Sequence, residues 1–268
     1  MKLKFISLAS GSSGNCYYLG TDSYGILIDA GIGVRTIKKT LKDHEIPFEN
    51  ILGVFITHDH ADHIKSAGFL GEKYGIPVYA TEDVHKGMNR NYGMTQKIYQ
   101  SKRVFVKDQV TEIRDLRITP FEVPHDGSDN VGFFIELGDI KFGFATDLGH
   151  ITETVTDYMS RANHLILEAN YDTEMLQHGS YPYHLKQRVQ GPFGHLSNRE
   201  CAEFLSKIYH EKMSHVFLCH LSRDNNHPEL AFKTVEFRLL QGDIRVGRDL
   251  ELIALKRNHP SEVYIFEQ

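Results

Sequence analysis

Several features that mark other protein classes are missing from this sequence. It has no tryptophan and three cysteines, Cys16, Cys201 and Cys219, which are odd in number and show no C-x-x-C spacing. This pattern argues against a disulfide scaffold and predicts buried thiols in a reducing, cytoplasmic compartment. No apolar run approaches the ~18 residues that a membrane span needs, and Leu3 to Leu8 is too short for a signal peptide.

An excess of basic charge is also absent. The 268-residue chain carries 30 Lys and Arg against 35 Asp and Glu, so its net charge is −5. This balance does not mark a nucleic-acid binder, although a local basic groove is compatible with an acidic protein. Basic residues are dense in one stretch, which contains Arg35, Lys38, Lys39 and Lys42, and this stretch is predicted to be a solvated helix face. A hydrophobic fraction of 41% excludes a disordered chain.

Histidine, by contrast, is abundant, since its 16 copies equal the number of phenylalanines. It is the commonest metal ligand and the usual acid–base group near neutral pH, so its positions decide what this excess means.

Short apolar runs alternate with segments of helical spacing in both halves of the chain. One example is the run from Ile51 to Thr57, after which a helix is predicted through about Tyr74. The segment from Tyr171 to Gly194 has mixed character and is predicted to be partly helical. Because no repeat or long linker divides the sequence, we predict one domain, residues 1–268. Its expected class is α/β (α+β), with two packed sheets and helices outside them.

The motif His58-x-His60-x-Asp62-His63 directly follows one of these apolar runs. In extended backbone, His58 and His60 point to the same side, and a helix starting near Asp62 turns Asp62 and His63 toward the same region. Imidazole and carboxylate ligands suit Zn²⁺, Fe or Mn²⁺, and the absence of cysteine argues against a thiolate site.

Further ligand-type residues end other apolar runs, namely Asp29, His125, Asp147 and His220. For any one of them, capping or surface exposure is as good an explanation as metal binding. Together with the histidine motif, they indicate that several strands deliver ligands to one place.

This ordered series resembles the five motifs of the metallo-β-lactamase fold over nearly the whole chain. The resemblance implies an αββα sandwich of two mixed β-sheets and two divalent metal ions (Zn, Mn or Fe) bridged by an aspartate and a hydroxide. It implies that one ion is held by His58, His60, His125 and Asp147. The other ion would be held by Asp62, His63, Asp147 and His220. Asp29 would orient one of these ligands.

Three other boxes resemble the transfer-RNA 3′-processing and phosphodiesterase branches of that superfamily. They are Leu167-Glu168-Ala169-Asn170, Gly194-His195-Leu196-Ser197-Asn198 and His220-Leu221-Ser222-Arg223. The sequence is most similar to the YycJ/WalJ-like branch, which is associated with 5′-to-3′ exonuclease action on DNA. The resemblance implies His195 as general acid, oriented by Glu168. With Asp62, these are the predicted catalytic residues.

Phosphate contacts are expected around this site. The helix amides near Ser197 and Asn198 are candidates because helix N-termini attract anions. Arg223 offers a fork suited to phosphate, and Lys186 and Arg188 lie in the aromatic and basic segment from Tyr181 to Arg188. A surface arginine and an ordinary amphipathic segment explain these residues equally well.

Other functions remain open at this point. A small-molecule phosphodiesterase, acting for example on cyclic nucleotides, is favoured by the acidic charge. Thioester or lactam hydrolysis does not need a phosphate-gripping arginine or the His195 box. A non-catalytic, metal-stabilised protein that binds nucleic acid is disfavoured because structural zinc sites are closed and mononuclear. Substrate choice between DNA, RNA and small phosphodiesters, cleavage polarity and oligomeric state stay open, and no membrane partner is expected.

Overall fold

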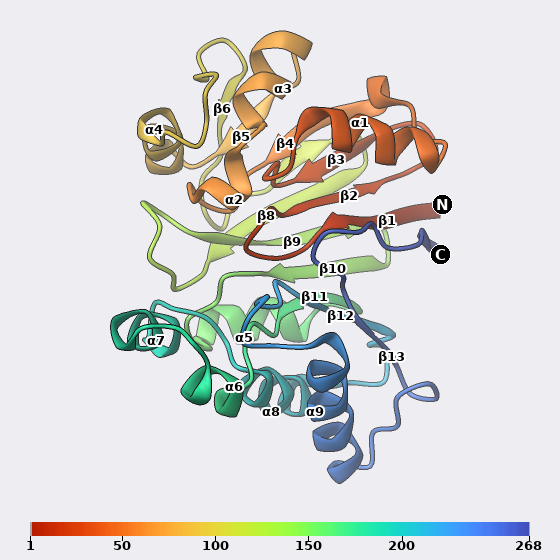
Figure 1. Ribbon diagram of the computed structural model, residues 1–268. Coiled ribbons are helices and arrows are strands. Elements are labelled where there is room, and N and C mark those ends of the chain that lie inside the picture. The colour runs from red at the N-terminus through yellow and green to blue at the C-terminus, as the bar shows by residue number, and fades with distance from the viewer. Residues whose placement is uncertain (1, 268) are drawn as a thin grey trace.

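The computed structural model describes residues 2–267, and its strands form two mixed sheets that lie face to face (Figure 1). Within those residues, the first sheet has the order β14 (Tyr264–Glu267), β1 (Lys2–Ala9), β2 (Cys16–Gly20), β3 (Gly25–Ile28), β4 (Ile51–Phe55), β5 (Val78–Ala80) and β6 (Lys102–Val104). The second has the order β13 (Glu251–Ala254), β12 (His215–Cys219), β11 (His164–Glu168), β10 (Ile140–Ala145), β9 (Val131–Leu137), β8 (Leu116–Glu122) and β7 (Thr111–Ile113).

In each sheet, one half is parallel and the other antiparallel. Strands β3 to β6 pair in parallel, as do strands β10 to β13. The carboxyl ends of neighbouring parallel strands therefore lie at the same edge of their sheet, which is where α/β proteins place their sites.

Helices cover the outer face of each sheet. The first sheet carries α1 (Val34–Asp43), α2 (Ala61–Ile64), α3 (Ala67–Tyr74) and α4 (Glu82–Arg90), after which the chain returns to the strands. The second carries α5 (Glu153–Ser160), α8 (Asn198–Ile208) and α9 (Pro228–Gln241). A short 3₁₀ helix spans Phe48–Asn50.

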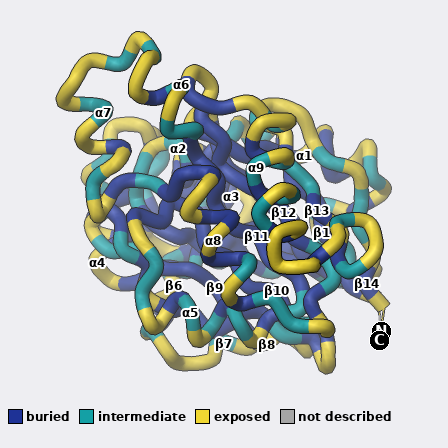
Figure 2. Tube along the Cα trace, turned by 90° about the horizontal axis from the view of Figure 1, so that it is seen from below, coloured by how far each residue is buried: buried dark blue, intermediate teal, exposed yellow. Residues whose placement is uncertain are grey.

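Three apolar layers hold these elements together. The layer between the sheets is rich in buried aromatic rings, including Phe5, Phe133 and Phe217. A second layer lies under α1, α3 and α4, and a third under α5, α8 and α9. In Figure 2 the buried residues follow the strands, and the exposed ones lie on the outer helices and loops. The predicted αββα sandwich of two mixed sheets is confirmed.

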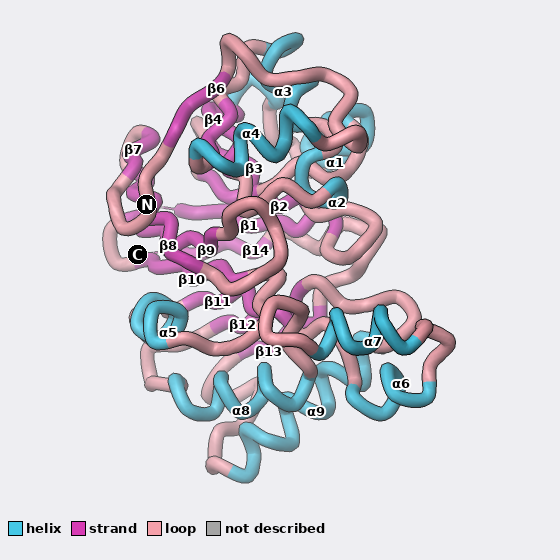
Figure 3. Tube along the Cα trace, turned by 90° about the vertical axis from the view of Figure 1, so that its left-hand side faces the viewer, coloured by secondary structure: helices cyan, strands magenta, loops and turns pink. Residues whose placement is uncertain are grey.

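Two short helices stand apart from this sandwich. We call residues 171–194 the α6–α7 lobe, because they contain α6 (Thr173–His178) and α7 (Tyr183–Gln190). The lobe has a small core of its own, with Tyr171, Leu176 and Val189 buried against Tyr181 and Leu185. Figure 3 shows α6 and α7 projecting to one side of the layers. The partly helical character predicted for this segment is confirmed.

Two helices differ from the sequence-based expectation. The helix predicted to run through about Tyr74 is broken into α2 and α3, because Ser66 donates its amide to the Ala30 carbonyl and its hydroxyl to the Ile32 carbonyl. Helix α4 is not predicted at all. Its start is capped by Thr81, whose side chain accepts a hydrogen bond from the Val84 amide.

Within the part of the chain that the structure describes, no helix has the length and apolar character needed to span a membrane.

Candidate metal centre

Five of the predicted site residues lie within three residues of the end of a strand, whereas His60, Asp62 and His63 lie at and in the short helix α2. Asp29 follows β3, His58 follows β4, and Asp147 follows β10. His125 and His220 follow β8 and β12. Asp29, Asp147 and His220 have left-handed backbone conformations, with φ of 57°, 53° and 53°. Such conformations cost of order 1–3 kcal/mol each for residues other than glycine and persist where the surrounding structure imposes them.

The side chains of these residues meet in two groups that share one carboxylate. His58, His60 and His125 bring one nitrogen each within 4.8 Å of one another, and the donor atoms of Asp62, His63 and His220 do the same. Asp147 joins the two groups. Its Oδ2 lies 3.2 Å from Nε2 of His63, and its Oδ1 lies 3.6 Å from Nε2 of His125.

Unpartnered nitrogens show that this cluster suits a cation. Nε2 of His58 and Nε2 of His125 are buried and have no hydrogen-bond partner among the described residues. Buried polar atoms are nearly always hydrogen-bonded, so these two atoms call for another partner. Nδ1 of His125 donates to the Gly194 carbonyl at 2.8 Å, which leaves the lone pair on Nε2. Histidine and aspartate donors fit a divalent transition metal.

Asp29 fixes the orientation of His63 from behind. Its Oδ2 accepts a hydrogen bond from His63 Nδ1 at 2.7 Å, and its Oδ1 accepts one from the Thr57 amide at 2.9 Å. Nε2 of His63 is thereby turned toward Asp147. Burial opposes a charged His63, but the carboxylates of Asp147, Asp29 and Asp62 outweigh it and raise the pKa of His63 well above its ordinary value.

Glu168 is a fully buried carboxylate at the last position of β11, and it accepts four hydrogen bonds within the described residues. Its Oε1 accepts from Nδ1 of His195 at 2.8 Å and from Nδ1 of His220 at 2.9 Å. Its Oε2 accepts from the amides of Leu148 and Leu196 at 2.8 and 3.0 Å. Burial opposes the charge on Glu168, but the charge and hydrogen bond of His195 outweigh it and lower the pKa of Glu168 to about 2. Glu168 is thus a fixed anion that holds two imidazoles.

Asp62 lies at the open side of the cluster. Its Oδ2 is 3.4 Å from Nε2 of His220 and 3.6 Å from Nε2 of His63. Burial works against its charge, but His63 and the hydrogen bond from His220 more than offset that and lower the pKa of Asp62. It therefore enters the cleft as a carboxylate.

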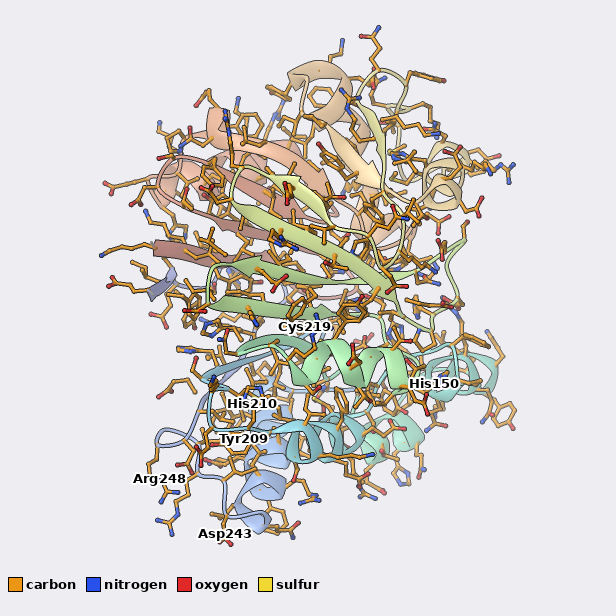
Figure 4. All side chains as sticks on the ribbon, turned by 180° about the vertical axis from the view of Figure 1, so that it is seen from behind. His150, Tyr209, His210, Cys219, Asp243 and Arg248 are labelled. Atoms are coloured by element: carbon orange, nitrogen blue, oxygen red, sulfur yellow. The ribbon has the colours of Figure 1, made fainter. Side chains whose placement is uncertain are left out.

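A cleft of about 210 Å³ opens beside the cluster, between the ends of the sheets and the α6–α7 lobe. Its walls are formed by Ser12, His60, Asp62, Asp147, Asn170, Tyr181, Leu185, Arg188, Val189, His195, His220, Ser222 and Asn225. Figure 4 shows where the two sides of the cleft lie. His150 is labelled near the lobe, and Cys219, the last residue of β12, lies in the body of the sandwich. Nδ1 of His150 donates to the Pro192 carbonyl at 2.7 Å and so ties the loop after β10 to the end of the lobe.

Sequence reasoning missed Asp126, which links the lobe to two of the predicted metal ligands. Arg188 donates from Nε and an NH₂ group to the two carboxylate oxygens of Asp126, at 2.7 and 3.1 Å. Oδ1 of Asp126 also lies 3.4 Å from Nε2 of both His60 and His125. The position of Asp126, directly after His125, is the one signal in the sequence that could have suggested it.

The other predicted phosphate contacts lie farther from the cleft or are occupied. The Ser197 amide donates to Glu200 and the Asn198 amide to the Tyr171 carbonyl, so both act within a capped helix start rather than at the cleft. The ammonium of Lys186 donates to the Gln177 carbonyl. Arg223 is 71% exposed and pairs with Asp224.

The chain belongs to the β-lactamase superfamily, whose domain model matches residues 24–220. Two relatives narrow this class. Exodeoxyribonuclease YycJ of Bacillus anthracis is 32% identical over 98% of this chain and 99% of its own. Exodeoxyribonuclease WalJ of Streptococcus pneumoniae (strain D39) is 34% identical over 93% of each chain.

The solved structures support the same fold. The metallo-β-lactamase-fold protein YhfI from Bacillus subtilis matches with a TM-score of 0.72 and 17% identity, covering 99% of this chain and 100% of YhfI. The resemblance stated from the motifs is thereby confirmed. The roles of the individual site residues stay predictions.

Proposed function

We propose that this protein is a metal-dependent phosphodiesterase that removes nucleotides from the 5′ end of DNA. The observation that carries this proposal is the cluster of histidines around Asp147, with two buried nitrogens that have no partner in the described protein. The exodeoxyribonuclease names of the two relatives support the choice of DNA, and the motif resemblance to the YycJ/WalJ-like branch supports the 5′ end.

The residues would hold two divalent ions in the pattern that the motifs indicated. His58, His60 and His125 would bind one ion, Asp62, His63 and His220 the other, and Asp147 would contact both. Paired divalent ions stabilise charge on both oxygens of a displaced phosphodiester and supply hydroxide near neutral pH. Asp29 would keep Nε2 of His63 available by holding the proton on Nδ1.

His195 is the proposed general acid. Its Nδ1 is bonded to Glu168, which leaves Nε2 as the atom that can hold a proton at the cleft. The buried Glu168 carboxylate fixes the ring of His195 through Nδ1, so that a proton on Nε2 can pass to the leaving oxygen. General acids of this kind contribute typically ~10²–10⁴-fold.

Arg188 is the proposed phosphate contact nearest to the cluster, because it lines the cleft and presents a planar fork. To bind phosphate, Arg188 has to give up at least one of its two hydrogen bonds to Asp126 for a phosphate oxygen. Arg223 and Lys186 would contact phosphates farther along the strand. The three cysteines are free and buried, which fits the reducing cytoplasm that we propose as the location.

End-labelled DNA tests this proposal. Purified protein loaded with Mn²⁺, Zn²⁺ or Fe²⁺ is expected to release labelled mononucleotides from a 5′-labelled strand at once, and from a 3′-labelled strand only late. His195→Gln should slow the release, with His184→Gln on the exposed side of the lobe as the matched control. Absence of cleavage with all three metals, or full activity in Asp147→Asn, would sink the proposal.

A second candidate is hydrolysis of small phosphodiesters, which the cleft volume of about 210 Å³ favours. Comparing kcat/KM for an oligonucleotide with that for an aryl phosphodiester and a cyclic nucleotide separates the two candidates. A preference for either small substrate would favour the second.

A further inference from the structure

The cleft extends beyond the predicted metal ligands into a part whose two walls differ in chemistry. On the lobe side, the wall is formed by the ring of Tyr181 and the side chains of Leu185 and Val189. On the side of the sheet ends, it is formed by Ser222 and Asn225, from the loop after β12, with Ser12 near them. One wall is thus mainly apolar, and the other offers hydroxyl and carboxamide groups.

Asn225 has the feature that points to a ligand. Its residue is 1% exposed, and its Oδ1 is buried without a hydrogen-bond partner among the described residues. The side-chain nitrogen of Asn225 also makes no hydrogen bond among the described residues. Its backbone, however, is fixed, since its amide donates to Ser222 Oγ and its carbonyl accepts from the Asp172 amide. The residue is therefore fixed at the cleft wall through its backbone, and its carboxamide oxygen, which lies beside Gly179 of the lobe, has no partner among the described residues.

The neighbouring residue, Asn226, shows that the loop does not leave every asparagine side chain without hydrogen-bond partners. The Asn226 side-chain nitrogen donates to the carbonyls of Ala169 and Asn170, and its Oδ1 accepts from the Asn198 side chain. Asn226 is a structural residue with its partners inside the protein. Asn225 lacks such partners, and buried polar groups rarely go without them unless a ligand or water supplies them.

The opposite wall can accept a flat ring. Tyr181 is half-buried in the small core of the lobe, and its hydroxyl reaches Asp224 Oδ2 at 3.5 Å, so the ring spans from the lobe toward the loop after β12. Tyr183, two residues later, is 77% exposed and is not part of the cleft wall. Bases stack on aromatic rings, and their edges bind carboxamides.

We propose that this part of the cleft binds the nucleoside of the terminal nucleotide, with its base against Tyr181 and Leu185 and a base edge hydrogen-bonded to Asn225. This inference rests on the proposed function, because it names what lies next to the phosphodiester that is cut.

Binding of deoxynucleoside 5′-monophosphates tests the inference without turnover. Titration calorimetry on the metal-loaded protein should show that Tyr181→Ala and Asn225→Ala each weaken nucleotide binding by about tenfold, whereas binding of inorganic phosphate changes less. Tyr183→Ala is the matched control from the same segment and should bind nucleotides as the wild type does. Melting curves report whether Asn225→Ala stays folded, and Leu185→Ala probes the same wall independently.

The outcomes separate this inference from the proposed function. If the protein cleaves DNA but Tyr181→Ala, Leu185→Ala and Asn225→Ala bind nucleotides like Tyr183→Ala, the nucleoside site is refuted and the exonuclease stands. If the protein does not cleave DNA but nucleotide binding depends on Tyr181 and Asn225, the nucleoside site stands and the exonuclease does not.

Discussion

A pair of histidines lies near each end of strands β11 and β12, and the two pairs share groups of different charge. At the start of the strands, His164 and His215 have ring centroids 5.5 Å apart and share the hydroxyl of Ser214, which lies 3.0 and 2.9 Å from their Nδ1 atoms. At the other end, His195 and His220 are 5.3 Å apart and share the carboxylate of Glu168.

The difference between a hydroxyl and a carboxylate decides what each pair can do. Burial lowers the pKa of His164 to about 3, and no acidic group opposes this effect. Burial acts on His220 as well, but Asp147, Asp62 and Glu168 outweigh it and raise the pKa of His220 to about 10. The two pairs thus differ in the acidic groups that face them, and the total of 16 histidines is not itself informative.

The largest effect is expected for Asp147. This residue joins the two groups of predicted ligands at the carboxyl ends of β11 and β12, which we call the acidic end because Glu168, Asp147 and Asp62 lie there. Asp147→Asn keeps the size of the side chain and tolerates the left-handed backbone, but it removes the charge. We expect metal affinity to fall by more than the ~10–100-fold typical of outer partners, with DNA cleavage lost accordingly. Metal analysis after dialysis and the end-label assay measure this. The exposed Asp83→Asn is the control, and a fully metallated Asp147→Asn protein would contradict the assignment.

His195 comes next, because it belongs to the acidic end without being a predicted metal ligand. His195→Gln should lower kcat on DNA by ~10²–10⁴-fold while metal content stays at the wild-type level. An aryl phosphodiester has a better leaving group and needs less help from an acid, so its hydrolysis should fall by a smaller factor. Equal losses on both substrates would indicate that His195 has a role in binding instead.

Asp29 should have a smaller effect, since it acts through His63. Asp29→Asn removes the charge opposite Nδ1 of His63, and metal affinity should fall by about 10–100-fold, with excess metal restoring most of the activity. A competition titration with a fluorescent chelator measures the affinity. Failure of added metal to restore activity would argue that Asp29 does more than orient His63.

The smallest effect is expected at the other end of the strands, and it concerns stability. The pKa of His164 is lower in the folded chain, at about 3, than its ordinary value of 6.5. The unfolded chain therefore takes up a proton between pH 6.5 and pH 3 that the folded chain does not. This contribution to stability is complete above pH 6.5 and declines as the pH falls, by up to ~1.4 kcal/mol per pH unit.

Replacing His164 by Gln should flatten this dependence. Urea unfolding at pH 7.5 and pH 5 should give a smaller difference in the free energy of unfolding for His164→Gln than for the wild type. His178→Gln is the control, because His178 lies in the exposed part of α6 with a side chain 80% exposed. An unchanged difference in His164→Gln would show that other groups, such as the half-buried His215, dominate the acid sensitivity.

Much of the fold and of the centre could be predicted from the sequence, since apolar runs that stop at Asp or His mark strands that end at a site. The ligand spacing in His58-x-His60-x-Asp62-His63 is local, and it defined one side of the cluster. Contacts between segments that are far apart in the chain are not indicated by any local sequence pattern. The pair of Arg188 and Asp126 joins residues 62 positions apart, and nothing in either segment indicates the other. The sequence offers Ser197 and Asn198 both as a helix cap and as phosphate contacts, and the structure shows the capping box of Ser197 and Glu200.

The left-handed backbone at Asp29, Asp147 and His220 means that strain is concentrated where the predicted ligands meet. Three such residues together cost on the order of 3 kcal/mol or more, which is a considerable part of the ~5–15 kcal/mol by which folded domains are usually stable. Glycine adopts this backbone without strain. His220→Gly would relieve this strain, but it would also leave a cavity and remove one hydrogen bond from the buried Glu168 carboxylate. The same contacts that form the centre therefore hold the strained backbone in place.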